Sequence, residues 1–539
     1  MKNIYLFWVI LAFPILAFAQ LPDTYDLRNV DGASYVTSVK SQQGGTCWTH
    51  GTMASIEGNL MITNIWEESG ETGEPALAEY HLDWWNGFNQ YNNDDLTPPS
   101  GSGLEVHMGG DYRVATAYLS RGEGAVREID GQQYENPPQR HLDSYHYFYP
   151  RTVEWYTIGD NLENINTIKQ KIMDHGVIAT CMFYDNAFIN WDYIHYQPPT
   201  DPSDPNHSVA IIGWDDNLVT QAPEPGAWLC KNSWGTWWGN NGYFWISYYD
   251  KHACRNVEMG AISFQEVEPM KYEKVFYHDY HGWRDQLEEV TTAANRFELN
   301  ENCILEAVSF FSNAENVDYT VTIFKQMGED GPEEALAEIS GNIEHIGFHT
   351  FDLPESVELM DMSEFVIQLE LSDGGIPYDR TSDIPVLLGA PNRRTIVEST
   401  AAENQSFYLN PEDGLWKDFY NYEDPSGYEH TGNFCIKGLC TTKGVGVNRY
   451  SSTKENLKVY PNPVESILNL TFDMESAGHA VVIITDMAGR QVADISTSVT
   501  QGNNTLTMAI DRSTIKPGFY TIRVENETHV ISRSSIIVK

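Results

Sequence analysis

The chain has 539 residues, with 76 acidic and 33 basic side chains, so its formal charge at neutral pH is −43. This length predicts three or four domains rather than one. The charge excludes nucleic acid as an expected partner, because phosphate binding depends on clusters of Lys and Arg that this acidic sequence lacks. A hydrophobic fraction of 41%, with 15 Trp and 30 Tyr, excludes a disordered polymer.

The first 19 residues are typical of a secretory signal peptide. Lys2 precedes an apolar run from Ile4 to Phe18, and Ala17-Phe18-Ala19 forms a small-x-small cleavage site. A membrane anchor is the alternative, but the run is shorter than the ~20 residues that a spanning helix needs. We therefore expect a mature chain that begins near Gln20, outside the cytoplasm.

Cysteine and acidic residues give no clear metal site. The seven Cys are an odd number in a compartment where disulfides persist, so at least one thiol is expected to stay unpaired. No CxxC pair occurs, which argues against zinc. The acidic loop at residues 215–217 is a candidate for calcium, although a solvated loop is the favoured interpretation. We expect neither a metal nor an organic cofactor.

Four regions follow the signal peptide. Residues 20–268 mix helical and strand patterns, which predicts an α+β domain with long surface loops. Residues 269–440 are predicted to form an all-β sandwich, residues 441–456 a linker, and residues 457–539 a small all-β domain. The strands expected in the sandwich include the alternating or apolar runs Ala307–Phe311, Tyr319–Phe324, Phe365–Leu371 and Pro385–Leu388.

The most informative motif surrounds Cys47, which directly precedes a predicted helix. Met53, Ile56 and Leu60 fall on one face of that helix. A thiol at a helix start faces the positive end of the helix dipole, which favours the nucleophilic thiolate. A buried small hydrophobe is the alternative role for this Cys.

The residues before Cys47 also suit catalysis. Gly44 and Gly45 allow a tight turn that exposes the sulfur. Gln42 or Gln43 is placed to offer an amide donor to a developing oxyanion.

Two later segments supply partners for the thiol. His207 precedes the apolar run Ser208–Trp214, which predicts a buried strand with a general base at its mouth. Asn232 follows another short strand, and its side chain suits the orientation of an imidazole. Taken singly, a His or Asn in such a place is more often structural. His50, on the predicted helix near Cys47, is a rival base.

Together these segments resemble the papain-like cysteine peptidases over residues 21–265. The resemblance implies protein or peptide substrates and a thioester intermediate. It implies that Cys47 is the nucleophile, His207 the base and Asn232 the group that orients the imidazole. It also implies roles for four further residues: Gln42 in the oxyanion hole, Gly109 and Gly110 as the pair whose backbone binds substrate, and Trp234 as a substrate-site residue that shields the His–Asn hydrogen bond.

The resemblance leaves the control of activity open. Gly44 stands where the family has a Cys, so the usual disulfide is absent. The stretch Leu21–Arg28 looks like the start of the mature family domain, which leaves no room for the usual inhibitory segment after the signal peptide. We favour an enzyme that is competent once folded. The alternative is that loops and the β-sandwich cover the cleft.

The remaining regions carry their own resemblances. Residues 272–283 and 305–314 look like the lectin-like β-sandwich of bacterial relatives, which implies contact with cell-surface glycans, although Trp283 is better interpreted as core. Residues 457–539 are similar to the C-terminal sorting domain of the type IX secretion system, which implies that machinery as a partner and a secreted or cell-surface location. A surface adhesin and a thiol-dependent transpeptidase are the alternative functions.

Overall fold

The structure is a computed structural model that describes residues 21–390, 395–442 and most of 458–538. The expected signal peptide and most of the expected linker lie outside the described residues. The chain divides into two compact units between residues 442 and 443. In the part of the chain that the structure describes, no helix is long and apolar enough to cross a membrane.

The first unit begins with an α+β part built around helix α1 (Cys47–Ile62), which is buried along almost its whole length. Met53, Ile56 and Leu60 are buried as the sequence predicts, and so are most residues on the other faces. A Cβ atom at Gly51 would lie 2.2 Å from the Ser208 Oγ, so only glycine allows this close approach of the helix to the sheet. The other helices are α2 (Ile65–Glu68), α3 (Glu79–Trp85), α4 (Tyr112–Ser120), α5 (Glu128–Gly131) and α6 (Ile165–His175).

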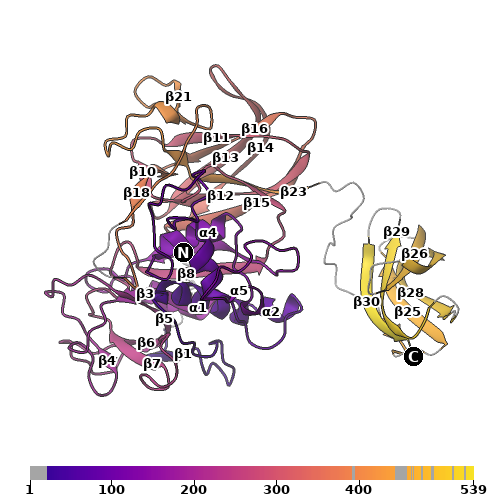
Figure 1. The fold of residues 1–539 in the computed structure, drawn as a ribbon, viewed down its shortest axis with the longest axis horizontal. Helices are drawn as coiled ribbons and strands as arrows, with labels where there is room; N and C mark the ends of the chain where they lie inside the picture. The colour runs from indigo at the N-terminus through magenta and orange to yellow at the C-terminus, as the bar shows by residue number, and fades with distance from the viewer. Residues whose placement is uncertain are drawn as a thin grey trace, which may run out of the picture. The chain divides into compact units, whose positions relative to one another are not determined.

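A 12-stranded sheet runs from the α+β part into the β-rich part (Figure 1). Its order is β4-β7-β6-β5-β3-β8-β2-β15-β12-β23-β9, and β1 pairs with β5. The expected boundary at residue 268 stays a prediction, because β2 and β15 continue one sheet across both parts. The strands of the α+β part are β1 (Thr24–Asp26), β2 (Phe148–Tyr156), β3 (Ile178–Met182), β4 (Ile194–His195), β5 (His207–Asp215), β6 (Ala227–Lys231), β7 (Tyr243–Ser247) and β8 (Ala261–Pro269).

The β-rich part contains a second sheet, in the order β14-β13-β16-β11-β20-β21. Its apolar side chains share one core with β12 and β23 of the long sheet, in which Phe297, Phe310 and Phe365 are buried. Two layers around one core agree with the predicted sandwich. The strands are β9 (Lys274–Phe276), β10 (Asp285–Leu287), β11 (Thr292–Glu298), β12 (Cys303–Ser312), β13 (Val317–Gly328), β14 (Gly331–Ile343), β15 (Gly347–Leu359), β16 (Glu364–Leu371), β17 (Ile376–Asp379), β18 (Ser382–Asp383), β19 (Ile396–Val397), β20 (Ser406–Leu409), β21 (Trp416–Asp418), β22 (Asn433–Phe434) and β23 (Ile436–Thr442), with a 3-10 turn at Phe419–Asn421.

One predicted strand of the sandwich is wrong. The apolar run Pro385–Leu388 forms no strand and lies in the loop between β18 and β19. Leu387 and Leu388 pack in the same hydrophobic cluster as Cys47 and Trp48 of α1. The apolar side chains of this run are therefore buried against the α+β part instead of in the sandwich.

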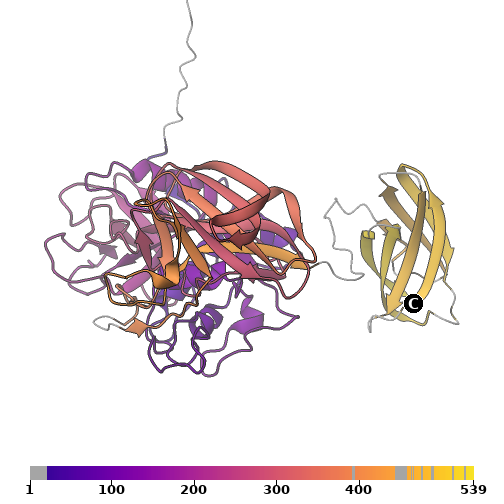
Figure 2. The same ribbon diagram turned by 90° about the horizontal axis from the view of Figure 1, so that it is seen from above.

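The second unit is a small all-β domain, as the sequence predicts. It has sheets of order β24-β25-β28 and β27-β26-β29-β30, whose strands run side by side in Figure 2. Buried Leu468, Leu470, Val482 and Ile522 belong to one core between these sheets. The strands are β24 (Lys458–Tyr460), β25 (Ile467–Met474), β26 (Gly478–Asp486), β27 (Gln491–Val499), β28 (Gly502–Ala509), β29 (Gly518–Asn526) and β30 (Val530–Val538).

Candidate active site

Two neighbouring strands bring His207 and Asn232 together. His207 is the first residue of β5, and Asn232 follows directly after β6, which pairs with β5. The His207 Nε2–H donates to the Asn232 Oδ1 at 2.8 Å. The Trp234 ring stacks on the imidazole with centroids 4.4 Å apart. The imidazole is therefore fixed in one orientation, and its Nδ1 is the nitrogen left to accept a proton.

Burial keeps this imidazole neutral. His207 is only 4% exposed. Burial lowers its pKa to about 4, although the hydrogen bond to Asn232 acts in the opposite direction. At neutral pH the ring is an uncharged base.

Cys47 is the first residue of α1, but its thiol is not activated in this state. The residue has no exposed surface. Burial raises the pKa of the thiol to about 12, while weaker hydrogen bonding from the backbone of Ser208 lowers it. The expectation of an exposed sulfur is therefore wrong, and complete burial opposes the effect of the helix start on the thiolate. No hydrogen bond among the described residues joins Cys47 to His207.

The turn before Cys47 is tied to the Asn232 side of the site. The Gln42 backbone N–H donates to the Ser233 carbonyl at 2.7 Å, and the Gln42 Oε1 accepts from the Ser233 Oγ at 2.6 Å. The Gln42 Nε2 donates to the Gly44 carbonyl at 3.0 Å. Gln43 is exposed and donates its backbone N–H to the Tyr80 hydroxyl. This geometry favours Gln42 over Gln43 as the amide that donates to the oxyanion.

The two expected substrate-binding glycines lie against the start of α1. A Cβ atom at Gly110 would lie 2.5 Å from the Trp48 ring, so only glycine fits at this position. The Gly110 backbone exchanges two hydrogen bonds with Leu388 of the β18–β19 loop, at 3.2 and 2.9 Å. A Cβ atom at Gly109 would lie 3.0 Å from the Leu388 carbonyl oxygen. The backbone of this pair is therefore occupied by another part of the same chain.

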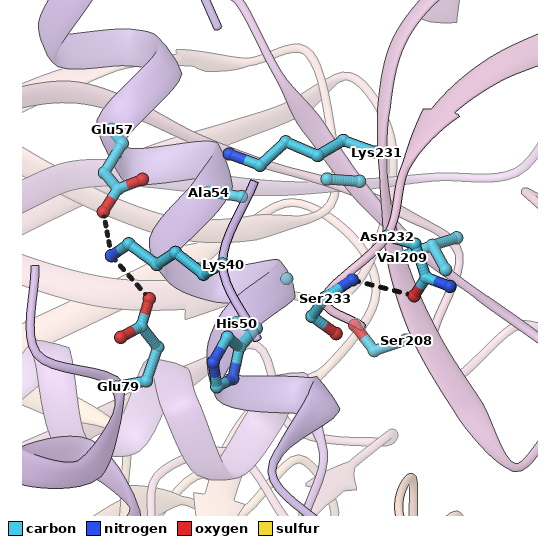
Figure 3. Close-up of a pocket in the computed structure, with 12 residues that line it drawn as sticks. Lys40, His50, Ala54, Glu57, Glu79, Ser208, Val209, Lys231, Asn232 and Ser233 are labelled. Carbon is cyan, nitrogen blue, oxygen red and sulfur yellow. Dashed lines mark hydrogen bonds and ion pairs between the residues drawn. The ribbon is translucent and has the colours of Figure 1, made fainter. Parts of the chain in front are cut away.

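A buried ionic cluster, which no local sequence pattern indicates, lies beside α1. The Lys40 Nζ lies 2.7 Å from carboxylate oxygens of both Glu57 and Glu79 (Figure 3). Burial favours the neutral amine, but the two carboxylates prevail and raise the pKa of Lys40 above its usual value. These residues and Asn232 line a cavity of about 20 Å³, which has room for about one water molecule.

Lys231 extends the ionic cluster toward Asn232. Its Nζ donates to the backbone carbonyl and the hydroxyl of Thr37, and that hydroxyl donates to Glu57 at 2.6 Å. Burial lowers the pKa of Lys231 to about 8. No short motif announces this network, because its members are far apart in the sequence.

His50 lines the same cavity but makes a different hydrogen bond. Its Nδ1–H donates to the Thr46 carbonyl at 2.9 Å, and burial lowers its pKa. The described hydrogen bonds give it no amide partner like the one that His207 has. The geometry favours His207 as the base.

The acidic loop and the remaining thiols carry no evident metal site. The Asp216 Oδ1 accepts from the Lys169 Nζ at 2.5 Å and from the Tyr248 hydroxyl at 2.7 Å. Over the described ranges, no three His, Cys, Asp or Glu residues gather as a metal site. All seven Cys are buried and unpaired.

Comparison with known families accounts for three regions of the chain. The papain family cysteine protease model matches residues 103–264. The chain carries a papain-family peptidase domain. A lectin like domain matches residues 275–440, and a secretion system C-terminal sorting domain matches residues 458–539. The predicted peptidase, lectin-like and sorting domains are confirmed. Of the expected site residues, those inside the peptidase match are Gly109, Gly110, His207, Asn232 and Trp234, and those before it are Gln42 and Cys47.

Individual relatives agree with this assignment. The oryzain gamma chain of Oryza sativa subsp. japonica is 30% identical over 234 residues, which cover 42% of this chain and 55% of the relative. Cathepsin K of Mus musculus is 25% identical over 253 residues, which cover 45% of this chain and 65% of the relative. This chain thus spans less than two thirds of both curated relatives.

A solved structure matches both domains of the first unit. The cysteine protease and lectin-like domains of Cwp84, a surface layer associated protein of Clostridium difficile, align with a TM-score of 0.59 and 22% identity. The alignment covers 78% of this chain and 89% of that chain. This likeness confirms the fold of a papain-like domain followed by a β-rich lectin-like domain.

Proposed function

We propose that this chain is a secreted cysteine peptidase that hydrolyses peptide bonds with Cys47 as its nucleophile. The observation that carries the proposal is the hydrogen bond from the His207 Nε2 to the Asn232 Oδ1, under the Trp234 ring and beside the start of α1. This bond fixes the tautomer and leaves the Nδ1 to take the thiol proton. Trp234 shields the bond from water.

The reaction follows from these roles. The Nδ1 of His207 accepts the proton of Cys47, and the sulfur attacks the substrate carbonyl. The backbone N–H of Cys47 and the amide of Gln42, once it leaves the Gly44 carbonyl, stabilise the oxyanion. His207 then protonates the leaving amine, which yields a thioester. A water molecule activated by the same ring hydrolyses that thioester and restores the thiol.

Gly109 and Gly110 support binding of an extended peptide. The backbone N–H and carbonyl of Gly110 already hold Leu388 of the β18–β19 loop in the structure. Such backbone pairing accepts many side chains, which suits protein or peptide substrates.

The sorting domain supports export by the type IX secretion system, and hence a secreted or cell-surface location. Contact with glycans stays a prediction. Trp283, the aromatic residue considered for it, is 4% exposed and lies beneath the guanidinium of Arg113. It belongs to the core rather than to a sugar site.

The test compares peptide hydrolysis by chains with Cys47 and with Cys47→Ala, each in the presence and absence of Gly389→Ala. Gly389 follows Leu388 in the β18–β19 loop, and a Cβ atom there would lie 2.3 Å from the backbone oxygen of Gly45, so the second substitution is expected to displace this loop from Gly110. We expect hydrolysis only where Cys47 is present. Equal hydrolysis by the Cys47→Ala chains would refute the proposal.

A further inference from the structure

The loop that reaches the active site belongs to the lectin-like domain. Its base is the short hairpin of β18 and β19, in which Ser382 pairs with Val397. Arg284 holds this base by donating to the Ser382 hydroxyl at 3.0 Å and to the Asp383 carbonyl at 3.1 Å. One domain therefore supplies the support, and the other receives the tip.

The tip binds the peptidase domain through backbone hydrogen bonds. Leu388 donates to and accepts from the backbone of Gly110, in an antiparallel bridge. The backbone N–H of Gly389 donates to the carbonyl of Asn206 at 3.0 Å, directly before His207. Consecutive residues of the tip thus bond by backbone atoms to Gly110 and to Asn206, as a peptide does when it pairs with a strand edge.

Gly389 meets the turn that leads to Cys47. A Cβ atom at Gly389 would lie 2.3 Å from the backbone oxygen of Gly45, and the φ of Gly389 is +100°. Both the contact and the backbone angle require glycine. No other residue fits the tip at this point without moving backbone.

The tip packs in the same buried cluster as the thiol. Leu387 is 7% exposed and Leu388 is fully buried, in the cluster that includes Cys47. The Ala390 N–H donates to the Leu387 carbonyl at 3.3 Å, which closes a turn. The tip therefore meets Gly110 through a single bridge and forms a turn at Leu387–Ala390.

We propose that Leu387–Gly389 is a tethered ligand of the peptidase cleft, which takes the place of substrate and keeps the chain latent until the loop is released. The proposal rests on the proposed function, since only a peptidase has substrate to exclude. It favours the alternative in which the β-sandwich covers the cleft over an enzyme that is competent once folded. Attachment to the same chain gives the ligand a high effective concentration, so a free peptide competes poorly.

The same contacts assign a class of peptide to the cleft. The bound segment presents leucine opposite Gly110, followed by glycine beside Asn206. Peptides with leucine followed by glycine are the expected ligands.

The experiment uses the full chain with Gly389→Ala, and Gly414→Ala as a matched control. Gly414 lies in the same domain at φ +68°, but an added Cβ there meets nothing within 4 Å. The first readout is the rate at which iodoacetamide modifies Cys47, located by mass spectrometry. The second readout is hydrolysis of a peptide that contains Leu-Gly.

We expect Gly389→Ala to raise the rate of Cys47 modification by about tenfold or more, as for a shift from a rare open state to a common one. Hydrolysis rises in parallel, and Gly414→Ala behaves as wild type. If Gly389→Ala fails to fold, Leu388→Asp replaces it, because a buried carboxylate without a partner also expels the tip.

Three outcomes separate the two proposals. Equal modification rates in wild type, control and both loop variants would overturn the tethered ligand, whatever the hydrolysis. Cleavage of the wild-type chain after Gly389 would also overturn it, because a retained ligand is not consumed. Faster modification without any hydrolysis would support the ligand and count against the peptidase.

Discussion

The two polar clusters beside α1 differ in charge although both are buried. His207 and Asn232 form a neutral pair, joined by one hydrogen bond of 2.8 Å. Lys40, Glu57 and Glu79 form an ionic cluster with two contacts of 2.7 Å. Asn232 and the ionic cluster even line the same small cavity. A charged cluster and a neutral pair therefore lie next to each other in the same buried region.

We infer that the ionic cluster stabilises the fold around the site, whereas the neutral pair of His207 and Asn232 serves the reaction. Lys40 joins α1 to α3 and also donates to the Leu77 carbonyl at 3.0 Å. Losing one partner of a buried ion pair is costly, so the cluster resists change. His207 must gain and lose a proton in each cycle, which a permanent ion pair would prevent.

The largest effect is expected from the nucleophile. In the Gly389→Ala chain, Cys47→Ala should lower kcat/KM by about 10⁴- to 10⁶-fold, because the covalent route is lost. Folding should be unchanged, as judged by thermal unfolding. Turnover within tenfold of the parent would place the nucleophile elsewhere.

The next largest effect is expected from the general base, and two substitutions distinguish His207 from His50 in that role. His207→Ala should lower kcat by about 10⁴-fold in the same background, since no other group takes the thiol proton. His50→Phe should stay within a fewfold of the parent, because His50 serves the Thr46 carbonyl. The opposite pattern in steady-state kinetics would move the base onto α1.

The ionic cluster should affect stability rather than chemistry. Lys40→Met should lower the free energy of unfolding by about 3–5 kcal/mol, because it leaves two buried carboxylates unpaired. The matched control is Lys325→Met, whose exposed pair with Glu334 is worth at most about 1 kcal/mol. Denaturant unfolding measures both. Equal losses in the two variants would contradict a structural role for the cluster.

At acidic pH, the free energies of unfolding of wild type and Lys40→Met should become more similar. Burial raises the pKa of Glu79, but the charge of Lys40 and other contacts prevail and lower it below its usual value. The stabilisation is therefore complete above the unfolded-state pKa of Glu and is lost as the pH falls through the lowered value. If the difference in the free energy of unfolding grows as the pH falls, the pKa of Glu79 is not lowered by Lys40.

A smaller kinetic loss than that of His207→Ala is expected at the orienting residue, Asn232. Asn232→Ala should lower kcat by about 10- to 100-fold, the usual cost when the partner that orients a functional histidine is removed. KM should change little, because Asn232 lies behind the imidazole. A loss as large as that of His207→Ala would mean that Asn232 takes part in proton transfer.

Local signals predicted much of this site. The Gly-Gly turn and apolar spacing marked the start of α1 at Cys47, and apolar runs marked the strands that begin at His207 and end before Asn232. Each of these signals is confined to a few consecutive residues. Periodicity and turn chemistry act over such distances.

Long-range packing could not be predicted in this way. Lys40, Glu57 and Glu79 follow no spacing rule, because folding alone brings them together. The run Pro385–Leu388 has the composition of a strand, but the sequence does not say which domain provides its partner. The complete burial of Cys47 also lay beyond local signals, since its cluster includes residues from distant segments, Leu387 and Leu388 among them.

Labelling by a peptide-like epoxide inhibitor tests the central claim most directly. The Gly389→Ala chain is treated with the inhibitor, and the modified residue is located by mass spectrometry while residual hydrolysis is measured. The account predicts one inhibitor per chain, on Cys47, with activity lost in proportion and no labelling after His207→Ala. Modification of another thiol, or full activity with Cys47 blocked, would contradict it.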